Sequence, residues 1–115
     1  MDVTRLADAD SYEAPNHFGC VALRLQGWDV SDTKSFWVGL SHFLPRGGCE
    51  FEAGGLEKVY VVVEGEITVK TDAGETTLRA LDSCHIPAGE ARSVENRTNL
   101  PASMMVVMPY PPGRA

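Results

Sequence analysis

The sequence lacks a sustained helical pattern, because no segment repeats apolar residues every three to four positions between capping residues. It also lacks any apolar run close to the roughly 20 residues that a membrane-spanning helix needs. Its basic residues are few, ten against sixteen acidic ones, and they are scattered along the chain. These absences argue against a helical bundle, a membrane protein and a nucleic-acid partner, since phosphate binding needs clustered cations.

The cysteines are few and odd in number, and their spacing matches neither a zinc knuckle nor a disulfide scaffold. They are Cys20, Cys49 and Cys84. The first fifteen residues carry acids where a signal peptide needs a basic start and an apolar run. We therefore expect reduced thiols in a cytoplasmic protein. Because Cys49 follows two glycines, we expect it in an exposed loop.

Short runs with an apolar residue at every second position fill most of the chain, separated by Gly, Pro and Asp. They cover residues 20–26, 35–44, 58–63, 66–71, 75–80 and 102–108. Many short strands in one chain of 115 residues predict a single all-β domain, built as an antiparallel β-barrel or jelly roll over residues 1–115. The first strand is expected at about residues 16–27.

The run KVYVVV at residues 58–63 is apolar on both faces, so both faces must be covered. One face can pack in the core, and the other, with Val59, Val61 and Val63, needs a second covering surface. This pattern predicts a homodimer.

The order of several segments resembles the two-motif pattern of the cupin superfamily, in particular the small single-domain barrels of the cupin 2 type. The segments are PRGG at 45–48, KVYVVVEGEITV at 58–69, LDSCHIPAG at 81–89 and RSVEN at 92–96, within about residues 35–108. In the family, the first motif runs through His-x-His to a glutamate and then to a glycine seven positions on. The second contains Gly-Asp, a Pro-x-Gly turn, a histidine and an asparagine. The resemblance implies a barrel in which the strand at 16–27 contributes to the dimer.

The residues that match the family are those that shape the backbone: Gly65, Asp82, Pro87, Gly89 and Asn96. The metal ligands of the family do not carry over. The His-x-His positions fall on Glu52 and Gly54, or on Phe51 and Ala53 if the spacer is one residue longer, the glutamate position falls on Lys58, and the second-motif histidine falls on Arg92. Ammonium and guanidinium groups offer no lone pair to a metal, so no cofactor is predicted.

If Lys58 and Arg92 keep the inward orientation of the ligands they replace, two cations face the barrel lumen. Such a pair can hold a carboxylate or phosphate, which predicts a binding protein for a small organic acid. The candidate ligand-binding residues are Lys58, Tyr60, Arg92, Glu52, His85 and Trp37. Alternatively, both cations form salt bridges with Glu52, Glu57 or Glu90 and bind nothing.

A second hypothesis is a small enzyme of the cupin type, such as an isomerase, decarboxylase or lyase. Its site would be either an irregular divalent-metal site built from His85, Glu52 and Glu57, or a metal-independent site in which one of these three residues acts as the base. A single bulge would exchange Glu57 and Lys58, so the sequence leaves open which of them faces the lumen. His17 lies in a polar stretch and is expected in an exposed loop.

Overall fold

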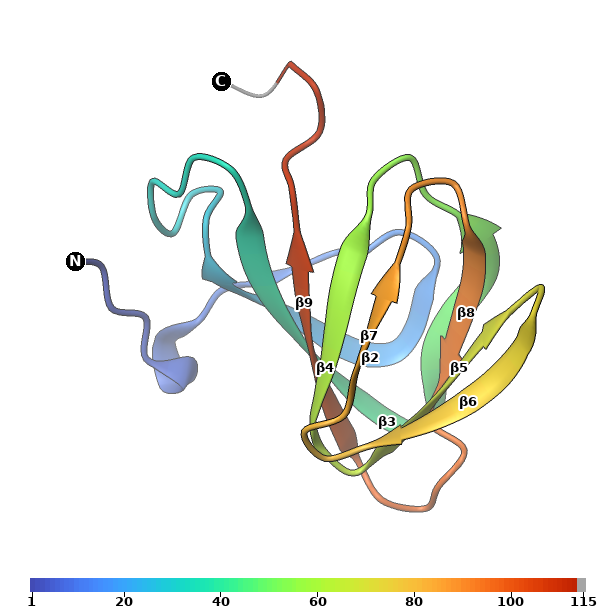
Figure 1. The fold of residues 1–115 in the computed structure, drawn as a ribbon. Coiled ribbons are helices and arrows are strands. Elements are labelled where there is room, and N and C mark those ends of the chain that lie inside the picture. Colours follow the sequence, from blue (N-terminus) through green and yellow to red (C-terminus); the bar gives the residue numbers. More distant parts are fainter. Residues whose placement is uncertain (114–115) are drawn as a thin grey trace.

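The computed structural model describes residues 1–113, and its regular secondary structure is almost entirely antiparallel strands around one core (Figure 1). A short 3-10 turn, η1 (Leu6–Asp8), precedes the strands, and the strand bounds are β1 (Ser11–Tyr12), β2 (His17–Gln26), β3 (Trp37–Ala53), β4 (Lys58–Glu64), β5 (Glu66–Thr71), β6 (Gly74–Arg79), β7 (Ser83–Ile86), β8 (Ala91–Glu95) and β9 (Ala102–Met108). The strand order is β6-β5-β8-β3-β9-β4-β7, with β2 also paired to β3 and β1 paired to β2. The predicted all-β barrel is confirmed. No helix within residues 1–113 is long and apolar enough to cross a membrane.

Strand β3 is longer than the sequence predicts and passes through the PRGG segment. Its first half pairs with β2 and β9, and its second half pairs with β8 and, at Gly48 and Cys49, with the start of β2. Two glycines permit this close crossing: a Cβ on Gly48 would lie 1.9 Å from the Val94 carbonyl oxygen, and one on Gly47 would lie 2.1 Å from that of Gly19. The expectation of an exposed loop at Cys49 is wrong, because Cys49 continues β3 and is buried.

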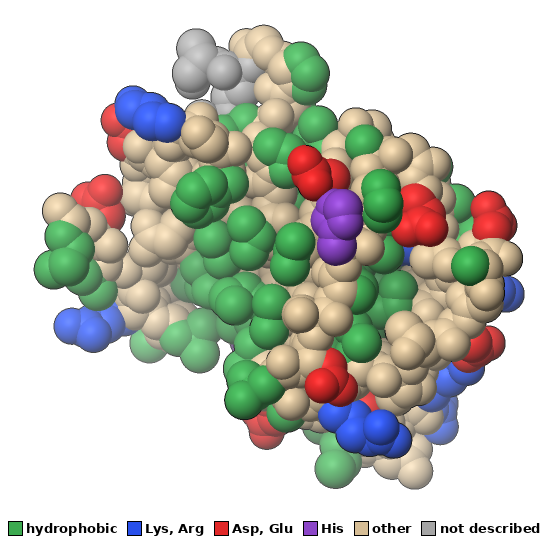
Figure 2. Space-filling model, in the orientation of Figure 1, with side chains coloured by type: hydrophobic (Ala, Val, Ile, Leu, Met, Phe, Trp, Pro, Cys, Tyr) green, Lys and Arg blue, Asp and Glu red, His purple; other side chains and the backbone are tan. Residues whose placement is uncertain are grey.

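The alternation along β4 decides which side chains face the barrel interior. Lys58, Tyr60 and Val62 are buried, whereas Val59 and Val63 are 37% and 45% exposed. Lys58 therefore faces inward and Glu57 is exposed. Figure 2 shows hydrophobic side chains gathered on the outer surface around β4 and β9. An apolar outer face of this kind suits a second copy of the chain, and the homodimer stays a prediction.

The residues that match the cupin backbone pattern hold turns and strand ends. Asn96 is fully buried: its amide nitrogen donates to the carbonyls of Phe43 (3.2 Å) and Leu100 (2.8 Å). Gly65 and Gly89 adopt positive φ angles of 80° and 84°. Leu81, which stands where the family has glycine, also adopts a positive φ of 72°. The backbone pattern of the motifs is thus retained even where one of its residues has changed.

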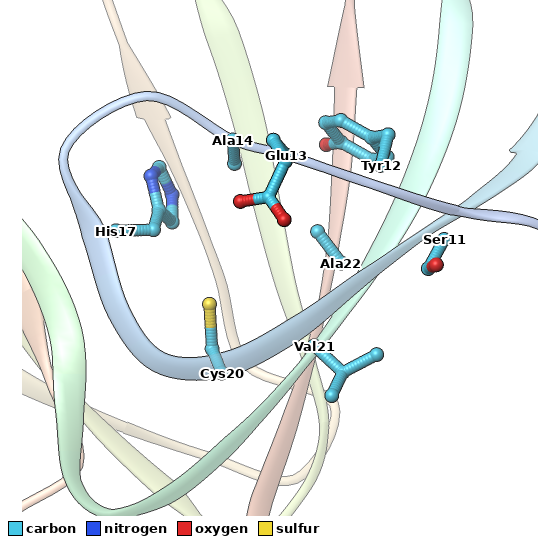
Figure 3. Close-up of a pocket in the computed structure, with 8 residues that line it drawn as sticks. All are labelled: Ser11, Tyr12, Glu13, Ala14, His17, Cys20, Val21 and Ala22. Atoms are coloured by element: carbon cyan, nitrogen blue, oxygen red, sulfur yellow. The ribbon is translucent and has the colours of Figure 1, made fainter.

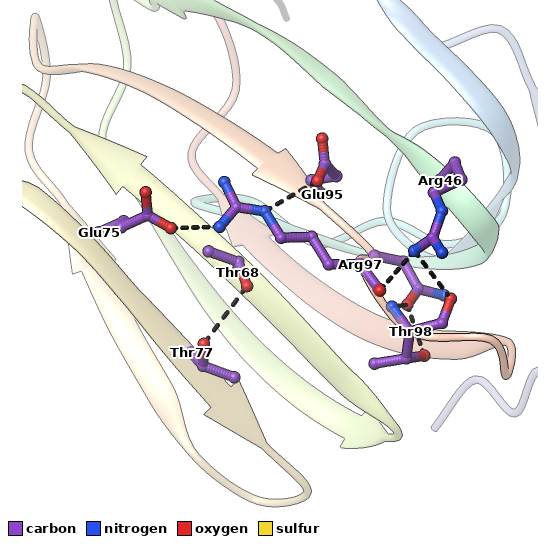
Figure 4. Close-up of polar contacts among 8 residues, drawn as sticks. Arg46, Thr68, Glu75, Thr77, Glu95, Arg97 and Thr98 are labelled. Carbon is purple, nitrogen blue, oxygen red and sulfur yellow. Dashed lines mark hydrogen bonds and ion pairs between the residues drawn. The ribbon is translucent and has the colours of Figure 1, made fainter.

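Polar contacts at the surface join β8 and the residues after it to neighbouring elements (Figure 4). The Arg97 guanidinium contacts both Glu75 and Glu95, and Arg46 donates to the Arg97 carbonyl. Each of these exposed ion pairs contributes little to stability, but through Arg97 they connect Glu95 on β8 to Glu75 on β6.

Candidate functional site

One cavity of 530 Å³ opens into the barrel between the inner faces of β2, β3, β4, β8 and β9. The segment around β1 and the C-terminal Pro111 complete its wall. The cavity is lined by Tyr12, Glu13, Ala14, Pro15, His17, Arg24, Trp28, Trp37, Ser41, Glu52, Lys58, Tyr60, Arg92, Met104, Val106, Met108 and Pro111. Its volume lies within the roughly 300–1,000 Å³ typical of small-molecule sites, and its lining combines an apolar wall with a few convergent polar groups.

Arg92 is held on the cavity wall by the pairing of two strands. It lies on β8 directly opposite Glu52 on β3. Its Nε donates to the Tyr60 hydroxyl (2.9 Å), and its Nη1 donates to the backbone carbonyl of Glu52 (3.3 Å). The Arg92 residue is 7% exposed. These contacts hold the guanidinium through neutral oxygen atoms.

Lys58 is the second buried cation, with 5% of the residue exposed. Among residues 1–113, neither Lys58 nor Arg92 forms an ion pair with a carboxylate. The nearby Glu52 carboxylate instead accepts a hydrogen bond from the Asn16 amide (2.8 Å). The alternative in which both cations are satisfied by salt bridges with Glu52, Glu57 or Glu90 is therefore wrong for this part of the chain.

The electrostatics of the cavity follow from this arrangement. Burial, and then the charge of Arg92, lower the pKa of Lys58 below its ordinary value. Burial raises the pKa of Tyr60 to about 12, although Arg92 acts in the opposite direction. Burial also acts against the charge of Arg92, but Tyr60, Cys49 and Glu52 outweigh it and raise the Arg92 pKa. Tyr60 is thus a neutral hydrogen-bond donor at neutral pH, beside two cations.

An aromatic wall faces the cations. The Arg24 guanidinium lies over the rings of Tyr12, Trp28 and Trp37, at 4.0, 4.6 and 5.0 Å from their centroids. This stacking attaches β1 and the loop after β2 to the barrel through cation–π attraction. The Trp37 side chain is buried beneath Tyr12, whose ring meets it edge to face at 6.0 Å.

The segment that carries Tyr12 also forms a smaller hollow against β2 (Figure 3). There Glu13 points toward the side of His17 and Cys20. The His17 Nδ1 lies 2.7 Å from the Pro15 carbonyl and donates to it. His17 is half-buried and lines the main cavity as well, so its expected placement in an exposed loop is wrong.

The structure places five of the six candidate residues on this cavity: Trp37, Glu52, Lys58, Tyr60 and Arg92. His85 does not join them. It is exposed on the outer face of β7, where its Nε2 lies 2.9 Å from the Glu57 carboxylate. The mapping with Glu52 and Gly54 at the His-x-His positions is favoured over the one with Phe51 and Ala53, because Phe51 and Ala53 are exposed.

A divalent metal does not fit the residues at the mapped ligand positions. Lys58 and Arg92 are cations without a lone pair, which leaves Glu52 as the single donor of that set. Within residues 1–113, no three His, Cys, Asp or Glu side chains are grouped so that they could hold a metal ion. The proposed irregular set is divided, with His85 and Glu57 outside and Glu52 inside.

Several cavity residues are missed by the sequence reasoning: Tyr12, Glu13, Trp28, Arg24 and His17. Arg24 had a signal, since it shares the β2 face of the small residues Cys20 and Ala22, and that face turns inward. A charged residue among small residues on the inward face of a strand indicates that this face lines a cavity and not a packed core. Tyr12 and Trp28 reach the site through loop geometry that carries no periodic pattern.

Comparisons with known proteins agree with this architecture. The family model described as a cupin domain matches residues 40–108. A protein of Mycobacterium tuberculosis named beta-D-galactosidase is 43% identical over 111 residues, which is 96% of both chains. The polyketide cyclase RemF from Streptomyces resistomycificus superposes with a TM-score of 0.84 at 18% identity, over 95% of this chain and 79% of that one. A sugar phosphate isomerase from a cupin superfamily of Silicibacter pomeroyi superposes with a TM-score of 0.79 at 24% identity, over 94% of this chain and 75% of that one. The two superpositions show a shared fold.

Proposed function

Because this chain belongs to the cupin domain family, we propose that it binds a small organic acid of the sugar-acid type in its barrel cavity. One observation carries the proposal: Lys58 and Arg92 are both buried on the cavity wall, and neither forms an ion pair with a carboxylate in residues 1–113. Burying a charge without a partner is costly, so two such charges at one cavity favour an anionic ligand.

The remaining lining suits a ligand with a polar ring attached to the acid group. The rings of Tyr12 and Trp37 can cover the apolar face of a sugar, and Tyr60, Ser41 and Glu52 can bond its hydroxyls. In this arrangement Arg92 binds the carboxylate with the nitrogen atoms that Tyr60 leaves free, and Lys58 adds a point charge. The relative named beta-D-galactosidase supports a sugar as part of the ligand.

A screen of small acids tests the proposal. We expect galacturonate, glucuronate or a related acid to raise the melting temperature, and we expect neutral galactose to have a smaller effect. Arg92→Ala is expected to weaken binding at least about 30-fold, because a buried charge pair loses one partner. Arg79→Ala is the matched control, since Arg79 is an exposed partner of Glu66. Equal stabilisation of the wild type and the Arg92→Ala variant by every acid would contradict the proposal.

Hydrolysis of a β-galactoside is a second candidate function. The specific observation is that two carboxylates, Glu13 and Glu52, line the same cavity, and paired carboxylates are what most glycosidases use. The Asn16 amide donates a hydrogen bond to one oxygen of the Glu52 carboxylate and so limits its motion.

We expect Glu52→Gln to lower any hydrolysis of 4-nitrophenyl β-D-galactoside at least about 100-fold, the scale of a lost acid–base group. Glu57→Gln is the control, because Glu57 is a carboxylate outside the cavity. Release of 4-nitrophenol is followed by absorbance. Unchanged hydrolysis in Glu52→Gln would rule out this second function and leave acid binding untouched.

A further inference from the structure

We propose that Lys58 is a carbonyl-reactive amine that forms an imine with a 2-oxo acid bound in the cavity. The inference rests on the proposed acid-binding site, and it narrows the ligand class to small acids with a carbonyl next to the carboxylate. No feature of the relatives described above assigns this chemistry to Lys58.

The placement of Lys58 is the first part of the argument. An amine attacks a carbonyl only through its unprotonated form, and enzymes favour that form by desolvating a lysine or by placing it beside another cation. Lys58 meets both conditions, since it lies on the cavity wall with 5% of the residue exposed, and the positive charge of Arg92 lowers its pKa further. It also forms no ion pair with a carboxylate in residues 1–113 that would stabilise its protonated form.

The backbone next to Lys58 leaves room for the amine. A Cβ built on Gly54 would lie 3.0 Å from the Lys58 Nζ, so a side chain at this position would press on the amine. Gly54 is the residue at the second His-x-His position of the family pattern. The two changes from that pattern, at Gly54 and at Lys58, are thus in contact with each other.

The neighbouring groups supply the other roles of imine formation. Arg92 can hold the carboxylate, which sets the adjacent carbonyl carbon near Lys58. The Tyr60 hydroxyl oxygen accepts the hydrogen bond from Arg92 Nε, so its own proton is left to donate to the carbonyl oxygen. Burial keeps this phenol neutral, with a pKa of about 12, so it remains a donor.

The reaction balances without a cofactor. The lone pair of the neutral Lys58 Nζ attacks the carbonyl carbon, the carbonyl oxygen takes one proton from the site, and the nitrogen returns one of its two protons to the site, which gives a neutral carbinolamine. The hydroxyl group of the carbinolamine then takes a second proton from the site and leaves as water, the nitrogen lone pair forms the C=N bond, and the nitrogen returns its remaining proton to the site. The sum is one 2-oxo acid and one amine giving one imine and one water, with no change of oxidation state.

Reductive trapping tests the inference on the full chain. The protein is incubated with pyruvate and sodium cyanoborohydride, and the labelled peptides are located by mass spectrometry. The chain has three lysines, and Lys34 and Lys70 are exposed, so they are internal controls. We expect one adduct per chain, with Lys58 labelled at least about tenfold more than either control, as for a desolvated amine.

Matched probes and variants sharpen the test. Acetone, which lacks the carboxylate, is expected to label Lys58 no better than it labels Lys34 and Lys70. Arg92→Gln is expected to reduce the pyruvate adduct at Lys58, and Lys58→Arg to abolish the site-specific adduct while the melting temperature shows a folded protein. Labelling spread evenly over the three lysines would overturn the inference.

The outcomes also separate this inference from the proposed function. If sugar acids or pyruvate stabilise the protein and Lys58 stays unlabelled, the acid-binding site stands and the imine chemistry fails. If no acid stabilises the protein and no adduct forms, both fail.

Discussion

Replacing Lys58 with methionine is expected to stabilise the free protein by about 1–2 kcal/mol while it removes acid binding. A methionine fills a similar volume and leaves no buried charge beside Arg92. In the free wild-type protein, the buried charge of Lys58 lowers stability, because its ligand is absent. Such a loss of stability in favour of function is common at functional sites.

The stability difference should depend on pH in one direction. The pKa of Lys58 is lowered in the folded state, whereas the unfolded chain holds the proton up to its ordinary value of 10.5. The unfolded state therefore binds more protons between the folded pKa and pH 10.5, and wild-type stability rises with pH across that window. The extra stability of the Lys58→Met variant over the wild type is largest below the folded-state pKa of Lys58 and decreases toward pH 10.5. Tyr60 titrates in both proteins, so its contribution largely cancels in the stability difference between them.

Chemical denaturation of the two proteins between pH 6 and 10 measures this effect. Lys70→Met is the matched control, because Lys70 is an exposed lysine on β5, and it should change stability by less than about 0.5 kcal/mol. A loss of stability in Lys58→Met at pH 7, at a size typical of a core deletion, would show that Lys58 is a satisfied structural residue.

Replacing Gly48 with alanine is expected to lower the free energy of unfolding by about 3 kcal/mol or more. The added Cβ would lie 1.9 Å from the Val94 carbonyl oxygen and 2.9 Å from its carbon, and both atoms belong to the backbone of β8. Backbone atoms cannot rotate away, so β3 and β8 must separate. These are the strands that hold Glu52 opposite Arg92, so the cavity wall is disturbed together with the barrel.

The control for Gly48→Ala is Gly55→Ala, because a Cβ at Gly55 meets no atom within 4 Å. Thermal and urea unfolding should leave Gly55→Ala close to the wild type. A Gly48→Ala protein with wild-type stability would show that β3 and β8 are not packed as closely as this geometry requires.

The sequence was sufficient to predict the barrel and the inward orientation of several residues that line the candidate site. Alternation along 58–63 and the spacing around Gly65, Pro87 and Gly89 predicted strands and turns, because these follow from local backbone preferences. The inward pair Lys58 and Arg92 followed from positions in the motifs. The spacing determined these positions well, since backbone-shaping residues restrict how strands can be paired.

Other features depend on contacts between distant segments, which a single sequence does not contain. The PRGG segment looked like the end of a strand, yet β3 continues because its glycines cross Gly19 and Val94 at close range. The stacking of Arg24 on Tyr12, Trp28 and Trp37 joins three separate regions. His85 was expected to face the lumen, but β7 pairs with β4 at the position opposite the outward Val59, which sends His85 outward as well.

A crystal structure of the protein with the strongest acid from the screen tests the central claim most directly. Two buried cations of one cavity are expected to bind the same anion. The predicted result is a carboxylate with oxygens within about 3 Å of both the Arg92 guanidinium and the Lys58 amine, the distance of charge-assisted hydrogen bonds. An acid bound elsewhere, or a cavity in which both cations are turned away from the ligand, would contradict it.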